Sequence, residues 1–324
     1  MNIFITGSAG FIGSHLCEAL LQAGHSVWGL DNFNSFYNPA LKEANIRAVK
    51  KTAEKTKSFF KNMTGDITDE KLLIQILSET KMDVVVHLAA MAGVRPSFEN
   101  PGLYEKVNGQ GTVNILQAMQ KTGTKNLVLA SSSSVYGLNQ KIPFCEDDPI
   151  QFTYSPYAAT KRANELMCFA FHRAYNLSVA SLRFFTVYGP RQRPDLAIRN
   201  FSEKMVQNQP ITIFGDGSAK RDFTYIDDII DGVTKSISWV ESQKNPVYEI
   251  FNLGESQTTS VLELVDLLEK NLKIKAEKIF KPAQVGDVPI TFADISKPKK
   301  ILGYNPQTKI AEGIKKFSEW LLDL

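Results

Sequence analysis

Short apolar runs alternate with longer amphipathic segments through the first half of the chain. Runs such as Val84-Val85-Val86 have no polar alternation, which is typical of strands covered on both faces. We predict strands at residues 2–6, 26–30, 58–63, 83–89, 126–131 and 179–184, and helices at 11–23, 72–79, 103–122 and 157–175. This order predicts an α/β protein with a doubly wound parallel sheet.

The pattern changes after about residue 189. Pro, Gly, Asp and Arg gather in the segments GPRQRPDLAIRN and FGDGSAKRDF, and the later helices are predicted at 227–241, 261–272 and 310–322. We therefore predict a larger part over residues 1–186 and a smaller C-terminal, substrate-binding lobe over residues 187–324, with the chain free to cross between them more than once. The lysine-rich stretch 42–57 is interpreted as a solvated helix face.

Composition excludes few classes but narrows the setting. A net charge of +3 on 324 residues gives no argument for nucleic acid or an anionic membrane as a partner. The three cysteines are widely spaced, which is typical of reduced thiols. The chain has no apolar stretch of about 18 residues and no signal-peptide pattern. From these features we expect a cytoplasmic, soluble protein. The four histidines lack metal-ligand spacing, so we expect no metal site.

A glycine-rich turn directly follows the first predicted strand. In the segment TGSAGFIG, residues 6–13, a glycine stands at every third position. Gly7 permits a tight turn, Gly10 lets the backbone approach a pyrophosphate, and Gly13 lets the helix pack closely on the strand. The N–H groups of the helix N-terminus then face the phosphates. The pattern predicts a Rossmann-type dinucleotide site, with a purely structural turn as the alternative.

An acidic residue at the end of the second strand points to the kind of dinucleotide. Asp31 can accept hydrogen bonds from ribose hydroxyls and repels a 2′-phosphate, and no Arg or Lys follows it closely in the sequence. NAD is therefore favoured over NADP. Asp66 follows the third strand and is predicted to meet the adenine, unless it caps a helix. Further candidate cofactor contacts border these turns: Phe11, Ile12, Asn32, Ile67, Leu88, Ala89 and Ala90.

A tyrosine and a lysine four residues apart begin a predicted helix. Tyr157 and Lys161 lie on one helix face because of this spacing. A phenol is a poor base at neutral pH, but a neighbouring ammonium and the positive nicotinamide of NAD favour the phenolate. Tyr157 is thus a candidate base for a hydroxyl proton, and Lys161 a candidate ligand of the nicotinamide ribose. The alternative is a chance surface pair.

Serines stand at the end of the fifth predicted strand, where a doubly wound sheet places its site. Ser132, in the segment SSSSVYG at residues 131–137, can hydrogen-bond a sugar oxygen alongside Tyr157. Its alternative is a strand-end polar residue satisfied by the backbone.

These motifs resemble the extended short-chain dehydrogenase/reductase family over nearly the whole chain. Within that family the chain is most similar to UDP-glucuronate 4-epimerases, through the segments HLAAMAGVRPS, SSSSVYG, SPYAATKRANE, LRFFTVYGPRQRPD, FGDGSAKRDFTYIDDI and GDVPITFAD. The resemblance implies an enzyme that keeps NAD bound, oxidises C4 of a UDP-sugar to a ketone and reduces it again with inverted stereochemistry. It also implies a homodimer formed partly through the helix that carries Tyr157.

The three serines Ser132, Ser133 and Ser134 separate this chain from related enzymes. By resemblance, 4,6-dehydratases carry Thr-Asp-Glu at this triplet, and UDP-glucuronate decarboxylases carry a Glu where Ser134 stands. Hydroxyl groups do not supply the acid and base that elimination of water needs. They are compatible with an epimerase that holds the substrate carboxylate out of alignment for loss of CO₂.

Several residues are candidates for substrate recognition. By resemblance, Arg193 recognises a substrate carboxylate, for which a bidentate Arg is well suited, unless it only pairs with Asp195. Thr186 stands where neutral-sugar epimerases carry an Asn, which favours a uronic acid. Arg221 suits a nucleotide diphosphate, unless it pairs with Asp222.

Two more candidates lie in loops. Asp287, in GDVP, resembles a position near the uridine ribose, with a turn residue as the alternative. Arg95, after the fourth strand, can reach a phosphate or a carboxylate. The predicted activity is 4-epimerisation of UDP-glucuronate. A UDP-glucuronate decarboxylase, a neutral UDP-hexose 4-epimerase and a non-catalytic NAD-binding regulator stay open as alternatives.

Overall fold

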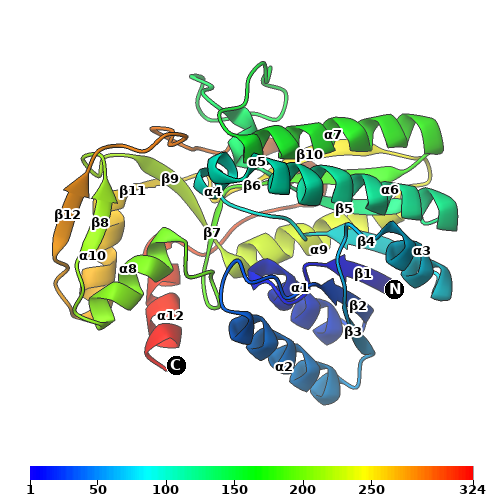
Figure 1. Ribbon diagram of the computed structural model, residues 1–324, viewed down its shortest axis with the longest axis horizontal. Coiled ribbons are helices and arrows are strands. Elements are labelled where there is room, and N and C mark those ends of the chain that lie inside the picture. Colours follow the sequence, from blue (N-terminus) through cyan, green and yellow to red (C-terminus); the bar gives the residue numbers. More distant parts are fainter. Residues whose placement is uncertain (324) are drawn as a thin grey trace.

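A seven-stranded parallel sheet forms the centre of the larger part of the molecule, as the alternation predicted (Figure 1). The structure is a computed structural model and describes residues 1–323. The strand order is β10-β6-β5-β4-β1-β2-β3, so it reverses between β1 and β4. The strands are β1 (Asn2–Thr6), β2 (Ser26–Asp31), β3 (Phe60–Thr64), β4 (Val84–His87), β5 (Asn126–Ser132), β6 (Ser178–Phe184) and β10 (Tyr248–Leu253). A doubly wound sheet binds ligands at such a reversal, beyond the carboxyl ends of its strands.

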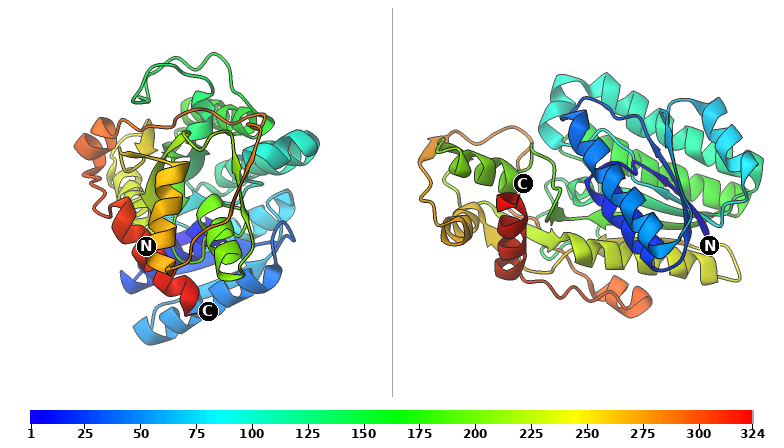
Figure 2. Two further views of the ribbon diagram at one scale, coloured as in Figure 1. Left: turned by 90° about the vertical axis from the view of Figure 1, so that its left-hand side faces the viewer. Right: turned by 90° about the horizontal axis from the view of Figure 1, so that it is seen from below.

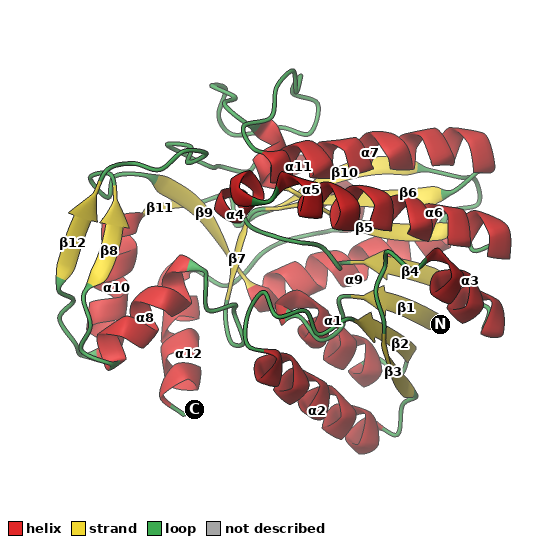
Figure 3. Ribbon diagram, viewed as in Figure 1, coloured by secondary structure: helices red, strands yellow, loops and turns green. Residues whose placement is uncertain are grey.

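Helices cover both faces of this sheet (Figure 3). Alternate residues of the central strands face the two sides: Ile3 and Ile5 join one apolar core, and Phe4 joins the other. This explains the apolar strands without polar alternation. The first core is closed by α1 (Phe11–Gln22), α2 (Pro39–Thr56) and α9 (Ile226–Ser242), and the second by α3 (Glu70–Glu79), α6 (Gly111–Thr122) and α7 (Pro156–Tyr175).

The helix predicted at 103–122 has a different geometry from the one expected. It consists of α5 (Pro101–Tyr104), a π-helical turn η1 (Glu105–Gln110) and α6. The wider turn carries Asn108, whose side-chain amide donates to the carbonyl of Met91 at 2.9 Å and to Thr160 Oγ1 at 3.1 Å. Asn108 also accepts from the N–H of Met91 at 2.8 Å. The turn therefore connects the loop after β4 with the start of α7.

The smaller part lies at one end of the large sheet (Figure 2). It contains a three-stranded sheet of order β11-β9-β7 and a parallel pair of β12 and β8. Its strands are β7 (Thr186–Tyr188), β8 (Ile211–Phe214), β9 (Lys220–Tyr225), β11 (Thr258–Ser260) and β12 (Lys278–Lys281). Its helices are α8 (Ala197–Val206), α10 (Val261–Leu272) and α12 (Ile310–Leu322).

The chain crosses between the two parts more than once. Helix α9 and strand β10 return to the large sheet, and α11 (Ser296–Leu302) packs against both of them. The boundary between residues 186 and 187 stays a prediction, and we assign α9, β10 and α11 to the larger part. Short elements connect the rest: α4 (Val94–Glu99) after β4 and η2 (Ser133–Tyr136) after β5. In residues 1–323, no helix has the length and apolarity to cross a membrane.

Candidate active site

A cavity of about 480 Å³ opens at the carboxyl ends of β1, β4 and β5, where the strand order reverses. It extends from the glycine turn after β1 to the loops of the smaller part. Most of the predicted site residues border it: Gly7, Gly10, Phe11, Ile12, Gly13, Asp31, Asn32, Ile67, Leu88, Ala89, Ala90, Ser132, Ser133, Ser134, Tyr157, Lys161, Thr186, Arg193, Arg221 and Asp287. Asp66 and Arg95 lie just outside this lining and touch residues that belong to it.

The glycine turn has a shape that only glycine can adopt at two positions. Gly7 has φ +74°, and a Cβ there would lie 2.8 Å from the backbone nitrogen of Ala89. A Cβ on Gly13 would lie 2.0 Å from the carbonyl oxygen of Gly7. Helix α1 begins at Phe11 without a side-chain cap, so its first N–H groups remain available to a ligand. These features fit a pyrophosphate lying against the helix N-terminus.

Asp31 lies at the end of β2 and is better connected than the sequence indicated. Its carboxylate accepts from the N–H of Ala9 at 3.2 Å and of Phe33 at 2.8 Å. Lys42, buried in α2, approaches it at 3.7 Å. The interpretation of stretch 42–57 as a solvated face was therefore wrong for Lys42, and a cation does lie near Asp31 in space. The carboxylate nevertheless borders the cavity, where it can meet ribose hydroxyls.

Asp66 lies at the outer end of the same cleft. It accepts from the Asn32 amide at 2.7 Å and from the N–H and hydroxyl of Thr68 at 2.8 Å each. Asp69, not Asp66, caps helix α3. The helix-cap alternative is therefore excluded, and Asp66 shapes the turn that carries Ile67 into the cavity.

The first turns of α7 bring a phenol and an ammonium to the strand end of β5. Ser155 caps the helix by accepting from the N–H of Ala158 at 3.1 Å, which fixes the helix start. Lys161 Nζ donates to the carbonyl of Ala130 at 2.7 Å and lies 6.0 Å from the ring centroid of Tyr157. Ser132 ends β5 on the same wall of the cavity as Tyr157. Its hydroxyl accepts from the backbone N–H of Ser134 at 3.1 Å, as its alternative predicted, and it also acts on the pKa of Tyr157.

Burial dominates the acid–base properties of this group. Burial raises the pKa of Tyr157, while the hydrogen bond with Ser132 and the charge of Arg193 lower it. Burial lowers the pKa of Lys161 to about 8, although the negative charge of Glu165 acts to raise it. Arg193 is thus a cation acting on the phenol that the sequence did not reveal. Further positive charge beside the ring would favour the phenolate.

His87, the last residue of β4, is a neutral structural residue. Burial, and then the charge of Lys161, lower its pKa to about 3. Its ring nitrogens contact the hydroxyls of Thr6 at 2.7 Å and of Thr112 at 3.1 Å. The imidazole therefore links β1, β4 and α6 beneath the cavity.

Arg193 contacts Asp195 and still presents a free edge. Its Nε and Nη2 donate to the two carboxylate oxygens of Asp195 at 2.9 and 2.8 Å. Its guanidinium carbon lies 5.6 Å from the ring centroid of Phe36. Among residues 1–323, Nη1 has no hydrogen-bond partner. The ion pair and carboxylate recognition are therefore compatible, because each uses a different edge of the fork.

The end of the cavity next to β9 carries an ion pair and a separate arginine. Arg95 Nη2 donates to Asp287 at 2.9 Å, and its guanidinium carbon lies 4.7 Å from the ring centroid of Phe214. Arg221 donates to the carbonyl of Lys220 at 2.9 Å and does not pair with Asp222.

Asp222 has a structural role of its own. It accepts from the backbone N–H groups of Glu255 at 2.8 Å, Ser256 at 3.1 Å and Ala293 at 3.1 Å. The alternative of an internal Arg221–Asp222 pair is therefore wrong, and Arg221 keeps its position on the cavity wall.

Sequence reasoning missed several residues of the wall. Phe36 and Tyr37, in the loop between β2 and α2, border the cavity beside Arg193. Their signal was two adjacent aromatic residues among the asparagines of this loop. Phe184 and Phe185 are buried and also border the cavity.

Comparisons with known proteins agree with this geometry. The sequence model of the family described as GDP-mannose 4,6 dehydratase matches residues 4–317. UDP-glucuronate 4-epimerase 1 of Arabidopsis thaliana is 42% identical over 336 residues, covering 99% of this chain and 77% of that protein. UDP-glucuronate 4-epimerase of Thermodesulfobacterium geofontis is 42% identical over 317 residues, covering 98% and 94%.

A solved structure is similar over the whole chain. The crystal structure of UDP-glucuronic acid 4-epimerase from Bacillus cereus, in complex with UDP-glucuronic acid and NAD, has a TM-score of 0.91 and 36% identity. The similarity covers 100% of this chain and 99% of the Bacillus cereus chain. The chain therefore belongs to the family described as GDP-mannose 4,6 dehydratase, and the predicted membership of the extended short-chain dehydrogenases/reductases is confirmed.

Proposed function

We propose that this protein is an NAD-dependent isomerase that converts UDP-glucuronate to UDP-galacturonate by inverting C4. The observation that carries the proposal is one cavity wall on which Tyr157, Lys161 and Ser132 meet, with the free edge of Arg193 bordering the same cavity. The epimerase names of the similar proteins support it.

The chain has the features that an NAD site needs. The glycine turn and the uncapped start of α1 would hold the pyrophosphate, Asp31 the adenosine ribose, and Lys161 the nicotinamide ribose. When bound, NAD accepts the hydride of C4 and later returns it to the ketone. Crystallised Bacillus cereus epimerase holds NAD, which supports the same cofactor here.

The protein groups manage the proton and the orientation of the sugar. Tyr157 takes the proton of the 4-hydroxyl and returns it in the second half of the reaction. Ser132 hydrogen-bonds the same oxygen and lowers the pKa of Tyr157. Lys161 is held against the Ala130 carbonyl, so its ammonium is fixed beside the phenol. Inversion then requires that the 4-keto sugar turn its other face to the cofactor before reduction.

The serine triplet argues against two related reactions. Elimination of water between C5 and C6 needs an acid and a base, which Ser133 and Ser134 do not supply at neutral pH. A 4-keto uronate is a β-keto acid and loses CO₂ when its carboxylate is aligned for it. The free edge of Arg193 would hold that carboxylate by two charge-assisted hydrogen bonds and keep it out of that alignment.

Product analysis tests the proposal and its alternatives. The purified protein is incubated with UDP-glucuronate, and products are followed by ¹H NMR. The expected product is UDP-galacturonate without release of CO₂. A UDP-pentose with CO₂ would identify a decarboxylase, and turnover of UDP-glucose alone would identify a neutral-sugar epimerase. Absence of any turnover in NAD-loaded protein would favour a non-catalytic NAD-binding regulator.

We also propose a homodimer formed through the outer face of α7. This helix exposes Leu166, Met167 and Phe169 at 55%, 39% and 48% of their surface, although it also carries Tyr157 and Lys161. Sedimentation velocity should give a dimer for the parent and a monomer for Leu166→Glu. A monomeric parent would contradict the proposal.

A cytoplasmic location is proposed from the three free cysteines.

A further inference from the structure

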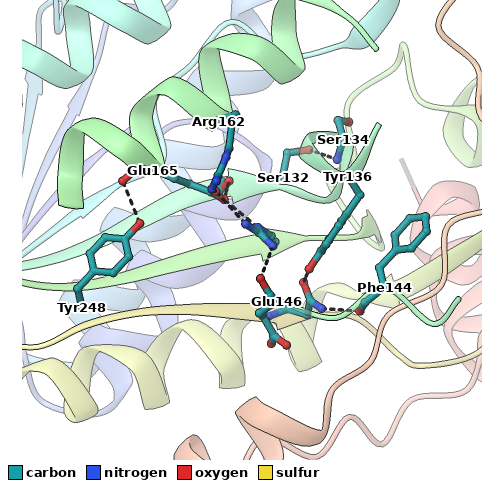
Figure 4. A network of polar contacts seen from close by, with 11 residues as sticks. Ser132, Ser134, Tyr136, Phe144, Glu146, Arg162, Glu165 and Tyr248 are labelled. Atoms are coloured by element: carbon teal, nitrogen blue, oxygen red, sulfur yellow. Dashed lines mark hydrogen bonds and ion pairs between the residues drawn. The ribbon is translucent and has the colours of Figure 1, made fainter. Parts of the chain in front are cut away.

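A buried ion pair lies directly beneath the serine end of β5. Glu165 on α7 and Arg183 on β6 are 0% and 1% exposed. Arg183 Nε and Nη2 donate to the two oxygens of Glu165 at 2.9 and 3.0 Å. Arg162 adds a third bond to Glu165 at 2.8 Å (Figure 4). Removing one partner of such a pair leaves a buried charge without compensation.

The pair contacts the serine segment from both sides. Before Ser132, the hydroxyl of Ser131 donates to Glu165 at 2.6 Å. After it, the ring of Tyr136 in η2 lies over the Arg183 guanidinium, 4.7 Å from centroid to carbon. Tyr136 is fixed in turn, because its hydroxyl donates to Asn252 at 2.6 Å. The short segment that carries Ser132, Ser133 and Ser134 is therefore held at each end.

Glu165 is also the last of three regularly spaced polar residues along α7. Tyr157, Lys161 and Glu165 are spaced by four residues and lie on one helix face. Lys161 bonds the carbonyl of Ala130 and Glu165 accepts from Ser131, while Tyr157 borders the cavity with Ser132. We propose that Glu165 is a positioning residue, which fixes the strand end of Ser132 against the helix that carries Tyr157 and Lys161. This inference rests on the proposed function, because kcat here is the rate of UDP-glucuronate epimerisation.

The charge of Glu165 acts on the same group. The titratable side chains that face Lys161 are Glu165 and Tyr157 on its own helix and His87 on β4, which is neutral. Glu165 is thus the anion that opposes the effect of burial on Lys161, and it raises the pKa of that ammonium. Without it, the guanidinium groups of Arg183 and Arg162 would remain nearby. We expect the proton of Lys161 to be held less tightly.

The test combines a titration with kinetics in Glu165→Gln, which removes the charge and keeps the size. In protein labelled with ¹³C-lysine, the Cε signal of Lys161 is assigned by its loss in Lys161→Met. Its titration is expected to move to lower pH by about 1 unit, because the charge of Glu165 raises the pKa of Lys161 and a nearby anion shifts a pKa by about 1–3 units. We expect kcat to fall by about 10-fold or more with little change in KM, because misplaced catalytic groups lose rate and not affinity.

Two further variants separate charge from position. Glu165→Asp returns the charge but shortens the reach, so the Lys161 titration should return toward the parent while kcat stays low. Glu269→Gln is the matched control, since Glu269 is also buried and bonded by two lysines but lies on α10, away from the cavity. It should leave the Lys161 titration and kcat unchanged.

Each outcome decides the inference. A folded Glu165→Gln protein with the parent's kcat, or with the parent's Lys161 titration, would overturn it. If that variant does not fold, Ser131→Ala decides, because it removes only the hydroxyl bonded to Glu165. A kcat lowered with unchanged KM supports the inference, and an unchanged kcat overturns it. If the parent does not convert UDP-glucuronate, the proposed function fails, and the titration alone judges Glu165.

Discussion

Replacing Arg193 with methionine tests the proposal that this residue recognises the carboxylate of a uronic acid. Methionine keeps an apolar stem that can pack near Phe36 but lacks the guanidinium. Asp195 then loses its partner, but its side chain is 38% exposed and stays hydrated. We therefore expect the fold to lose no more than about 1 kcal/mol, as for other partly exposed ion pairs.

The effect on binding follows from the free edge of the guanidinium. A hydrogen bond to a charged group contributes about 1.5–3 kcal/mol. Asp195 already shares the guanidinium, and the Arg193 side chain is 19% exposed, so we take about 2 kcal/mol for the whole carboxylate contact. That corresponds to about a 30-fold rise in Kd for UDP-glucuronate. UDP-glucose has no carboxylate, and its Kd should change by less than about 3-fold.

Isothermal titration calorimetry on NAD-loaded protein with the Tyr157→Phe change measures both ligands without turnover. The matched pair is Tyr157→Phe with and without Arg193→Met. An equal loss of affinity for both sugars would mean that Arg193 only shapes the cavity. An unchanged Kd for UDP-glucuronate would refute carboxylate recognition by this residue.

Three further predictions follow from the same cavity. Gly13→Ala places a Cβ 2.0 Å from the Gly7 carbonyl oxygen. We expect urea unfolding to show a loss of about 1–3 kcal/mol in the free energy of unfolding, and we expect the protein to be purified without bound NAD. A normal NAD content would contradict the role of the turn. The pKa of Lys161 in the free protein lies near 8, with the ammonium present below that value. The ratio kcat/KM, which reports the pKa values of the free enzyme, should therefore fall as pH rises through about 8, and a flat profile from pH 7 to 9.5 would exclude a need for the ammonium. Tyr157→Phe should lower kcat by about 10²–10⁴-fold in the NMR assay with an unchanged fold by circular dichroism, and parent-like turnover would remove Tyr157 from the mechanism.

The sequence predicted those parts of the structure that depend on interactions between residues close together in the chain. The strand at 84–87 begins with three consecutive valines because both faces of the sheet are covered, so this run alone predicted it. The turn at Gly7 and Gly13 depends on contacts within a few residues and on the next strand, and its spacing was sufficient to predict it.

Contacts between distant segments were not visible in the sequence. Lys42 reaches Asp31 only because α2 packs against α1, so its burial could not be inferred from a lysine-rich helix. Phe36 meets Arg193 across the cavity from a position more than 150 residues earlier. Helical periodicity also could not distinguish the π-turn at Asn108 from a regular helix, because the turn spans only 6 residues and is too short for its period to be recognised.

The transfer of hydrogen at C4 is the step on which the whole account depends, and labelled substrate measures it directly. UDP-glucuronate carrying deuterium at C4 is converted in ordinary water, and the product is analysed by NMR and mass spectrometry. The account predicts UDP-galacturonate that keeps its deuterium at C4, because the same hydride leaves and returns within the closed site. Product with deuterium washed out to solvent would contradict it, as would inversion at a different carbon.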